Sequence, residues 1–365
     1  MVVEIDRKPM EVKRVLIVVA FLAAAALVFL GVPSPSHAQE LAWGLTAIPG
    51  LKVGHFTLSE RPTGCTVVLA EGGAVGGVDV RGGAPGTREI ALLDPVNSVQ
   101  VVHAVVLSGG SAFGLDAASG VVRYLDERDI GYRVGPNTVP IVVGAILFDL
   151  SVGDDPSIRP DADCGYRAAT HASNEASAEG NVGAGAGATV GKLRGMARAM
   201  KGGIGTASVT LDSGLTVAAI VAVNAVGDII DPTTQSVLAG VRTANGQGLA
   251  DARLLLREGA SNGPQGGANT TIGVVATNAT LTKPEATKVA QMAQDGLART
   301  IYPAHTPSDG DTVFSLAVGT FSGSASVSTI GALAADVMAE AIVRAVRAAT
   351  GLPGIPAAGD ISAGR

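Results

Sequence analysis

The sequence contains few cysteines, few aromatic residues and few charges. Of its 365 residues, 2 are Cys, 3% are aromatic and 16% are charged, and the formal net charge is −6. A negative chain with few aromatics and no basic run is poorly suited to binding nucleic acid. Cys65 and Cys164 form no Cys-x-x-Cys pair, which excludes a thiolate zinc site and a multi-disulfide framework. One disulfide could form after export, but we favour two small buried apolar side chains.

Common motifs of serine, nucleotide-binding and metal enzymes are also missing. Residues 109–114 resemble the G-x-S-x-G turn of serine hydrolases, but Phe113 stands where that motif needs Gly. Residues 185–192 resemble a phosphate-binding loop, but Leu193 replaces the Ser or Thr that binds Mg²⁺. The histidines show no metal-ligand spacing. We therefore expect neither a cofactor nor a metal.

The first 38 residues have the pattern of an export signal. A basic start precedes an unbroken apolar run from Val15 to Leu30, and Ser36-His37-Ala38 matches the small-x-small pattern of a signal peptidase site. We predict that residues 1–38 are removed and that the mature protein is periplasmic or secreted. The alternative is a membrane anchor over residues 15–32, because the apolar run is only slightly short of a spanning helix.

The rest of the chain predicts a mixed α/β fold. Short apolar runs rich in Val and Ile predict β-strands that are covered on both faces, and glycine-rich loops separate them. The predicted strands are 66–70, 103–107, 207–211, 216–223, 272–277 and 313–318. Apolar residues at helical spacing predict helices over 112–128 and 330–349. A third helix is predicted after Thr282, because Thr282 and Glu285 form a capping box.

Thr270 is the strongest candidate for a catalytic residue. It stands where a glycine-rich loop turns into a predicted strand, directly after Asn269. Attack of its hydroxyl on the Asn269 carbonyl would cut the chain and leave Thr270 as a new amino terminus. A terminal Thr carries its own base, an α-amino group with a pKa of roughly 7.7–8. An ordinary turn before a strand is the alternative interpretation.

Four other polar residues are candidates for the same site. Asp309 and Asp311 flank Gly310 before a strand, which indicates either a solvated turn or a carboxylate pair that relays a proton. Lys192 follows a run of Gly, Ala and Thr, so its ammonium must reach solvent or serve a site. Asn224 ends an apolar strand, where its amide could donate to an oxyanion or simply close a turn.

Together these segments resemble the P1 family of self-processing peptidases, also called the S58 or DmpA family. The resemblance covers nearly all of residues 44–350. It is carried by Asn224, Asn269-Thr270 and the segments 44–55, 77–89, 107–118 and 305–312.

The resemblance implies a four-layer αββα sandwich of the N-terminal-nucleophile-like type, and a precursor that cuts itself once. Residues 39–269 would form a large chain and residues 270–365 a small chain. The two chains would stay associated in a homo-oligomer, resembling a tetramer, that hydrolyses amide bonds of peptides or oligoamides without a metal.

The resemblance also implies roles for single residues. Thr270 matches the nucleophile, Lys192 the supporting lysine, and Asn224 the asparagine of the oxyanion site. Asp309 and Asp311 match the acidic pair behind the nucleophile. The Asn-Thr-Thr junction and the two aspartates are most similar to the branch that cleaves 6-aminohexanoate oligomers.

Two departures from the family pattern bear on the substrate. Family aminopeptidases place an acidic residue near 145–147 to hold a free amine, but this chain has Ala145-Ile146-Leu147. The nylon-oligomer branch has Tyr where this chain has Phe148. Aminopeptidase and endo-hydrolase activity both stay open. The sequence is also compatible with an acyltransferase of the ornithine acetyltransferase type and with a catalytically silent secreted binding protein.

Overall fold

The structure is a computed structural model that describes residues 44–259 and 269–361. The predicted export segment 1–38 lies outside these residues, so its removal stays a prediction. Among the described residues, no helix is long and apolar enough to cross a membrane.

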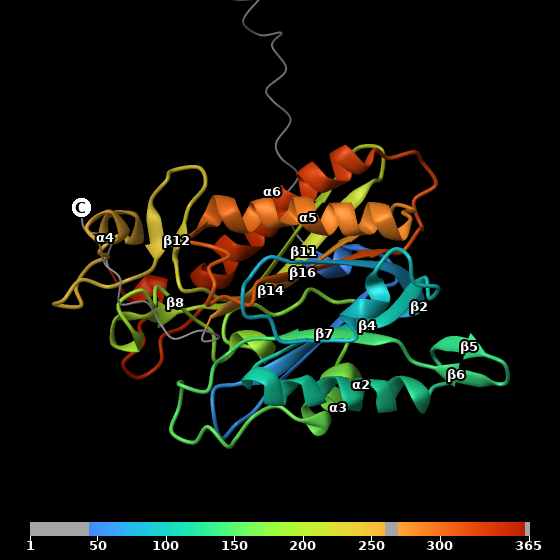
Figure 1. The fold of residues 1–365 in the computed structure, drawn as a ribbon, viewed down its shortest axis with the longest axis horizontal. Helices are drawn as coiled ribbons and strands as arrows, with labels where there is room; N and C mark the ends of the chain where they lie inside the picture. Colours follow the sequence, from blue (N-terminus) through green and yellow to red (C-terminus); the bar gives the residue numbers. More distant parts are fainter. Residues whose placement is uncertain (1–43, 260–268, 362–365) are drawn as a thin grey trace, which may run out of the picture. The chain divides into compact units, whose positions relative to one another are not determined.

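Helices and strands are stacked in four layers (Figure 1). One β-layer contains β10, β11, β14 and β16 and is covered by α5 and α6, while the other contains β1, β4 and β7 and is covered by α2 and α3. The predicted αββα sandwich is therefore confirmed. The helices are α2 (Ala117–Asp126), α3 (Ala162–Thr170), α5 (Lys283–Thr300) and α6 (Val327–Arg347). The strands are β1 (Lys52–Thr57), β4 (Val101–Ser108), β7 (Val142–Ile146), β10 (Gly203–Thr210), β11 (Thr216–Asn224), β14 (Thr270–Thr277) and β16 (Thr312–Ala317).

The long strand β2 (Gly64–Val80) connects the two β-layers. Its first half pairs with β1 and β4, and its second half pairs with β16. The register shifts between Leu69 and Ala74, and such an irregularity bends a strand. As a result, the hydrogen-bonded order β10-β11-β14-β16-β2-β4-β7-β3 runs continuously through both layers, with β3 (Thr87–Arg88) at its end.

Alternating side chains of the central strands fill two different cores. In β11, Val217, Ala219 and Val221 pack toward α5 and α6. Ala218 and Ile220 of the same strand pack between the two β-layers. Both faces of the strand are thus buried, which explains why its sequence is apolar throughout rather than alternating.

The predicted elements are present with shifted ends. All six predicted strands form, and α5 begins at the predicted capping box, in which Glu285 accepts the Thr282 backbone N–H at 2.8 Å. Helix α6 begins before the predicted residue 330, because the Ser326 side chain caps it. Residues 112–116, predicted as the start of a helix, belong instead to a 3-10 helix (Ser111–Asp116) ahead of α2.

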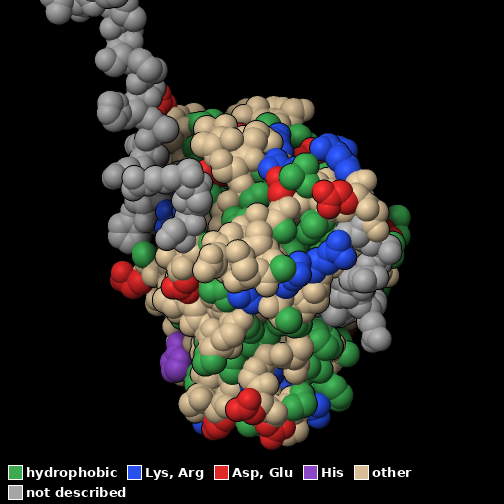
Figure 2. All heavy atoms as spheres, turned by 90° about the vertical axis from the view of Figure 1, so that its left-hand side faces the viewer, with side chains coloured by type: hydrophobic (Ala, Val, Ile, Leu, Met, Phe, Trp, Pro, Cys, Tyr) green, Lys and Arg blue, Asp and Glu red, His purple; other side chains and the backbone are tan. Residues whose placement is uncertain are grey.

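Smaller elements surround the layers. They are the β-pairs β5 (Tyr132–Val134) with β6 (Asn137–Val139) and β8 (Thr189–Val190) with β9 (Met200–Lys201), the strands β12 (Asp228–Ile230), β13 (Val237–Ala239) and β15 (Ile301–Tyr302), and the helix α4 (Ala252–Arg257). Figure 2 shows the face nearest α4, β8 and β12, where Lys and Arg side chains form a band.

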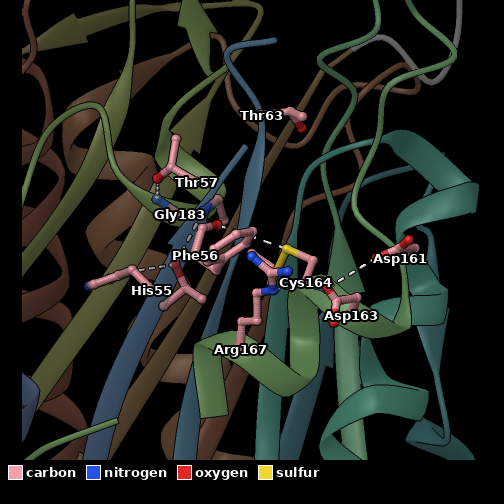
Figure 3. Close-up of a disulfide and its surroundings, with 12 residues drawn as sticks. His55, Phe56, Thr57, Thr63, Asp161, Asp163, Cys164, Arg167 and Gly183 are labelled. Carbon is pink, nitrogen blue, oxygen red and sulfur yellow. Dashed lines mark hydrogen bonds and ion pairs between the residues drawn. A yellow bond between two sulfur atoms is a disulfide. The ribbon is translucent and has the colours of Figure 1, made fainter. Parts of the chain in front are cut away.

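Cys65 and Cys164 form a disulfide that ties β2 to α3 (Figure 3). Both side chains are buried, and the Cα atoms are 6.3 Å apart. The preferred expectation of two unpaired apolar cysteines was wrong. Residues 99 positions apart met because α3 packs directly over β1 and β2.

We expect the disulfide to stabilise the folded chain by constraining the unfolded state. The double substitution Cys65→Ala and Cys164→Ala should lower the free energy of unfolding by about 2–4 kcal/mol. Urea unfolding with and without a reductant measures this effect. The reductant should lower the free energy of unfolding of the wild type and leave that of the double variant unchanged. Equal free energies of unfolding for the two proteins without reductant would contradict a stabilising disulfide.

Candidate active site

Thr270 is the first residue of β14, between β11 and β16. It pairs with Asn224 across the antiparallel ladder, while the preceding Asn269 bridges to Asp309 on the parallel side. Thr270 is only 2% exposed, and its hydroxyl contacts the carbonyl oxygen of Asn269. The fold thus places the candidate nucleophile against the peptide bond that it is predicted to cut.

The Asn224 side chain is held by three neighbours at the end of β11. Its Oδ1 accepts hydrogen bonds from the Thr189 N–H at 3.0 Å and from the Lys192 ammonium at 2.8 Å. Its Nδ2 donates to the Phe148 carbonyl at 2.9 Å. In the intact chain, the amide predicted to serve an oxyanion is therefore engaged with the protein itself.

Lys192 is buried beside Asn224 rather than extended into solvent. Its backbone N–H donates to the Val226 carbonyl at 2.8 Å, and its Nζ also donates to the Asn224 carbonyl at 2.9 Å. Burial lowers the pKa of Lys192 to about 7, although Asp309 and other carboxylates oppose the shift. A lysine with this pKa can exchange a proton near neutral pH.

Asp309 and Asp311 lie in a buried turn, 1% and 2% exposed. The solvated-turn interpretation was therefore wrong. The backbone of residues 81–84 covers the turn: the Ala84 N–H donates to the Asp309 carbonyl at 2.8 Å, and the Arg81 N–H to the Asp311 carbonyl at 3.0 Å. Gly82 has to be a glycine here, because a Cβ would lie 2.3 Å from the Asp311 nitrogen.

The two carboxylates have different partners. Asp311 accepts the Thr271 N–H at 2.7 Å with one oxygen and the His305 N–H and Nδ1 at 3.0 and 2.9 Å with the other. Asp309 accepts the Thr306 N–H at 2.9 Å. Burial and the neighbouring Asp311 raise the pKa of Asp309. The turn therefore combines a carboxylate anchored to the nucleophile strand with one that holds a proton more readily.

Sequence reasoning missed three contributors to this cluster. They are the His305 ring, the Thr189 N–H and the Phe148 carbonyl. Two of them act through the main chain and leave no sequence signal. His305 lacks metal-ligand spacing, but its place six residues before Asp311 could have suggested the contact. Within residues 44–259 and 269–361, no group of three or more His, Cys, Asp or Glu is arranged to hold a metal.

The segment that differs from family aminopeptidases is apolar in the structure as well. Ala145, Ile146 and Leu147 are buried, and none carries a charge for a substrate amine. The next acidic residue, Asp149, forms a buried ion pair with Arg61 at 2.9 Å and accepts the Thr63 hydroxyl at 2.6 Å. Its charge is therefore already compensated inside the protein.

Comparisons with known proteins find relatives over most of the chain. Residues 44–358 match the model of peptidase family S58. An uncharacterized aminopeptidase of Mycobacterium leprae is 45% identical over 86% of this chain and 92% of its own length. A 6-aminohexanoate-oligomer endohydrolase of Kocuria sp. (strain KY2) is 31% identical over 82% of this chain and 84% of its own length.

Solved structures support the fold. A β-aminopeptidase of a Burkholderia species superposes with a TM-score of 0.61 at 24% identity, covering 88% of this chain and 90% of its own. The L-aminopeptidase D-Ala-esterase/amidase of Ochrobactrum anthropi gives a TM-score of 0.63 at 19% identity, covering 89% and 92%. That protein is described as a variant of the Ntn-hydrolase fold.

The lowered pKa of Lys192 predicts a pH-dependent stability. The folded-state pKa of about 7 lies below the ordinary 10.5, so the unfolded chain binds more protons between these values. Lys192 should therefore make the free energy of unfolding rise with pH above 7, by about 1.4 kcal/mol per pH unit. We expect Lys192→Met to remove this rise in a Thr270→Ala background, in which the chain should stay in one piece.

Urea unfolding between pH 7 and 9 measures the slope. Lys288→Met is the control, because it removes the same charge from an exposed position. Equal slopes for the Lys192→Met and Lys288→Met variants would contradict the expected protonation of Lys192.

Proposed function

The chain belongs to peptidase family S58 and is a hydrolase of amide bonds, and on this premise we propose that it is a self-processing N-terminal-threonine hydrolase. In this proposal the precursor is cut between Asn269 and Thr270. Residues 39–269 form the large chain and residues 270–365 the small chain, and both remain in one hydrolase domain.

One observation carries the proposal. The Thr270 hydroxyl contacts the carbonyl oxygen of Asn269, and the buried groups Lys192, Asn224 and Asp311 surround that junction. Buried charges are costly unless they are paired or functional, and strongly shifted ionisable groups gather at active sites. A threonine that merely began a strand would not need this surrounding cluster.

Maturation proceeds by acyl transfer within the chain. Thr270 Oγ attacks the Asn269 carbonyl carbon, the Oγ–C bond forms, and the C–N bond breaks. The hydroxyl proton passes through a neighbouring base and ends on the Thr270 nitrogen. Lys192 suits this base because its pKa is about 7, whereas the Thr270 nitrogen is still an amide. Water then hydrolyses the ester and releases the Asn269 carboxylate.

Turnover uses the amine that maturation has freed. The Thr270 α-amino group takes the hydroxyl proton, directly or through water, while Oγ attacks the substrate amide. Asn224 and nearby backbone amides hold the oxyanion, and a cationic Lys192 keeps the amine in its neutral, basic form. Asp311, backed by Asp309, orients the nucleophile strand through the Thr271 N–H. Water then releases the acyl group.

The same proposal covers compartment and assembly. The precursor is exported by residues 1–38, with membrane anchoring by residues 15–32 as the alternative. The cleaved chains associate as a homo-oligomer and act on small peptides or oligoamides. Because Thr270 is 2% exposed in the intact chain, substrate gains access only after the chain has been cut.

For the substrate, we favour internal amide bonds of short oligoamides. The apolar stretch Ala145–Leu147 and the ion-paired Asp149 leave no carboxylate in this segment for a free amine. The relative from Kocuria, named as an oligomer endohydrolase, is compatible with this choice. Removal of amino-terminal residues is the second candidate, because the relative from Mycobacterium leprae is named as an aminopeptidase.

The nucleophile is tested by intact mass. We expect the purified wild type to consist of two chains separated between Asn269 and Thr270. Thr270→Ser should still be cut, because it keeps the hydroxyl. Thr270→Val should stay whole and lose more than about 10³-fold in turnover, because it keeps the shape without the nucleophile. A whole wild-type chain, or a Thr270→Val variant that is cut and active, would contradict the scheme.

The substrate class is tested with paired substrates. We expect short oligoamides with free and with N-acetylated amino termini to be cut within about tenfold of each other, because no carboxylate binds the amine and a tenfold ratio corresponds to only about 1.4 kcal/mol. Chromatography of the products measures both rates, with Thr270→Val as the blank. Loss of cleavage on acetylation would instead favour the aminopeptidase.

A further inference from the structure

The peptide N–H of Gly310 donates a hydrogen bond to the carbonyl oxygen of Asn269 at 2.9 Å. This is the carbonyl of the bond that is proposed to be cut, and the Thr270 hydroxyl contacts the same oxygen. A preorganised backbone N–H that already reaches a carbonyl oxygen which later becomes negative is the kind of donor that forms an oxyanion site.

The orientation of the Gly310 N–H is fixed by its neighbours. In a trans peptide, the carbonyl of Asp309 and the N–H of Gly310 point in opposite directions. The Asp309 carbonyl accepts the Ala84 N–H at 2.8 Å, and the Gly310 carbonyl accepts the Thr312 hydroxyl at 2.9 Å. Both peptide planes that flank Gly310 are therefore anchored, and its N–H is held toward Asn269 before any reaction begins.

Gly310 also has to be a glycine for this approach. A Cβ there would lie 2.7 Å from the Thr270 hydroxyl oxygen and 2.8 Å from the Ala84 carbonyl oxygen. Such distances are shorter than real contacts and would force the nucleophile away. The missing side chain thus lets a backbone donor and the nucleophile reach the same carbonyl.

We propose that the Gly310 N–H is the oxyanion donor for self-cleavage, which rests on the proposed self-processing function. When Thr270 Oγ attacks the Asn269 carbonyl carbon, the carbonyl electron pair moves onto the oxygen, and the Gly310 N–H stabilises the resulting charge. The pair returns as the C–N bond breaks, and the proton from Oγ ends on the Thr270 nitrogen. The step therefore balances without a further reactant.

Self-cleavage and turnover then use different donors. In the intact chain, the Asn224 amide nitrogen donates to Phe148 and its oxygen accepts from Lys192 and the Thr189 N–H. Asn224 is assigned to the oxyanion of a bound substrate, whereas Gly310 serves the chain's own carbonyl. Replacing the Gly310 backbone nitrogen should accordingly slow self-cleavage without removing the donor that Asn224 provides for substrate hydrolysis.

The decisive experiment replaces the Gly310 amide by an ester in the full chain. Glycolic acid at position 310 exchanges the N–H for oxygen and adds no side chain. We expect self-cleavage, followed by intact mass, to slow by about 10²–10³-fold, the loss typical of a single oxyanion donor.

The matched control is an ester at Val318, whose N–H donates to the Thr277 carbonyl at 3.1 Å beyond the other end of the same strand pair. Each ester removes one backbone hydrogen bond between the β14 side and the β16 side, so both should lower the melting temperature by a similar amount. If the hydrogen bond from the Gly310 N–H only joins the two strands, the Gly310 ester protein and the Val318 ester protein will cleave themselves at similar rates. This result would overturn the inference.

A spectroscopic measurement covers the case of a poorly folding ester. In the Thr270→Ala chain with a ¹³C-labelled Asn269 carbonyl, the Gly310 ester should move the labelled infrared band to higher frequency, and the Val318 ester should not. No difference would also overturn the inference. The proposed function is tested separately: an uncut wild type contradicts self-processing, while a normally cut Gly310 ester contradicts only the role of its N–H.

Discussion

The parallel pairing of β14 with β16 is the constraint on which the candidate site depends. Ile272 pairs with Thr312, and the ladder continues backward to the bridge between Asn269 and Asp309. The nucleophile strand and the acidic turn are therefore in register residue by residue. Because side chains alternate along a strand, a slip of one residue would turn the Thr270 side chain to the opposite face. Cores on both sides of these strands prevent that slip.

The site gathers several buried charges in one cluster. Arg61 and Asp149 are also buried, but they compensate each other's charge as an ion pair. Lys192 differs, because burial outweighs the pull of the carboxylates near it and its pKa falls to about 7. Asp309 shifts in the opposite direction for the same reason. Such groups cost stability, and the pKa of about 7 lets Lys192 exchange a proton near neutral pH.

The sequence predicted the strands, and the five candidate residues that it singled out lie close together, but their surroundings were missed. Apolar runs located the strands, because burial on both faces leaves a strong signal. The burial of Asp309 was missed, because the backbone of residues 81–84 covers it and backbone contacts leave no side-chain pattern. Unpaired cysteines were wrongly favoured, because the pairing of Cys65 with Cys164 depends on how α3 packs rather than on local spacing. The role of His305 depends on the tertiary fold in the same way.

A charge balance explains why one cluster could serve both stages of the proposed reaction. Cutting the chain would create a carboxylate at Asn269 and an amine at Thr270 among Lys192, Asp309 and Asp311. Two nearby carboxylates would repel the new carboxylate, which favours its departure and opens the space in front of Thr270. The same carboxylates would favour a protonated amine, and Lys192 opposes this when it is cationic. With a pKa of about 7, Lys192 is partly neutral and partly cationic at neutral pH. Its neutral form can accept a proton in the precursor, and its cationic form disfavours protonation of the Thr270 amine in the mature site.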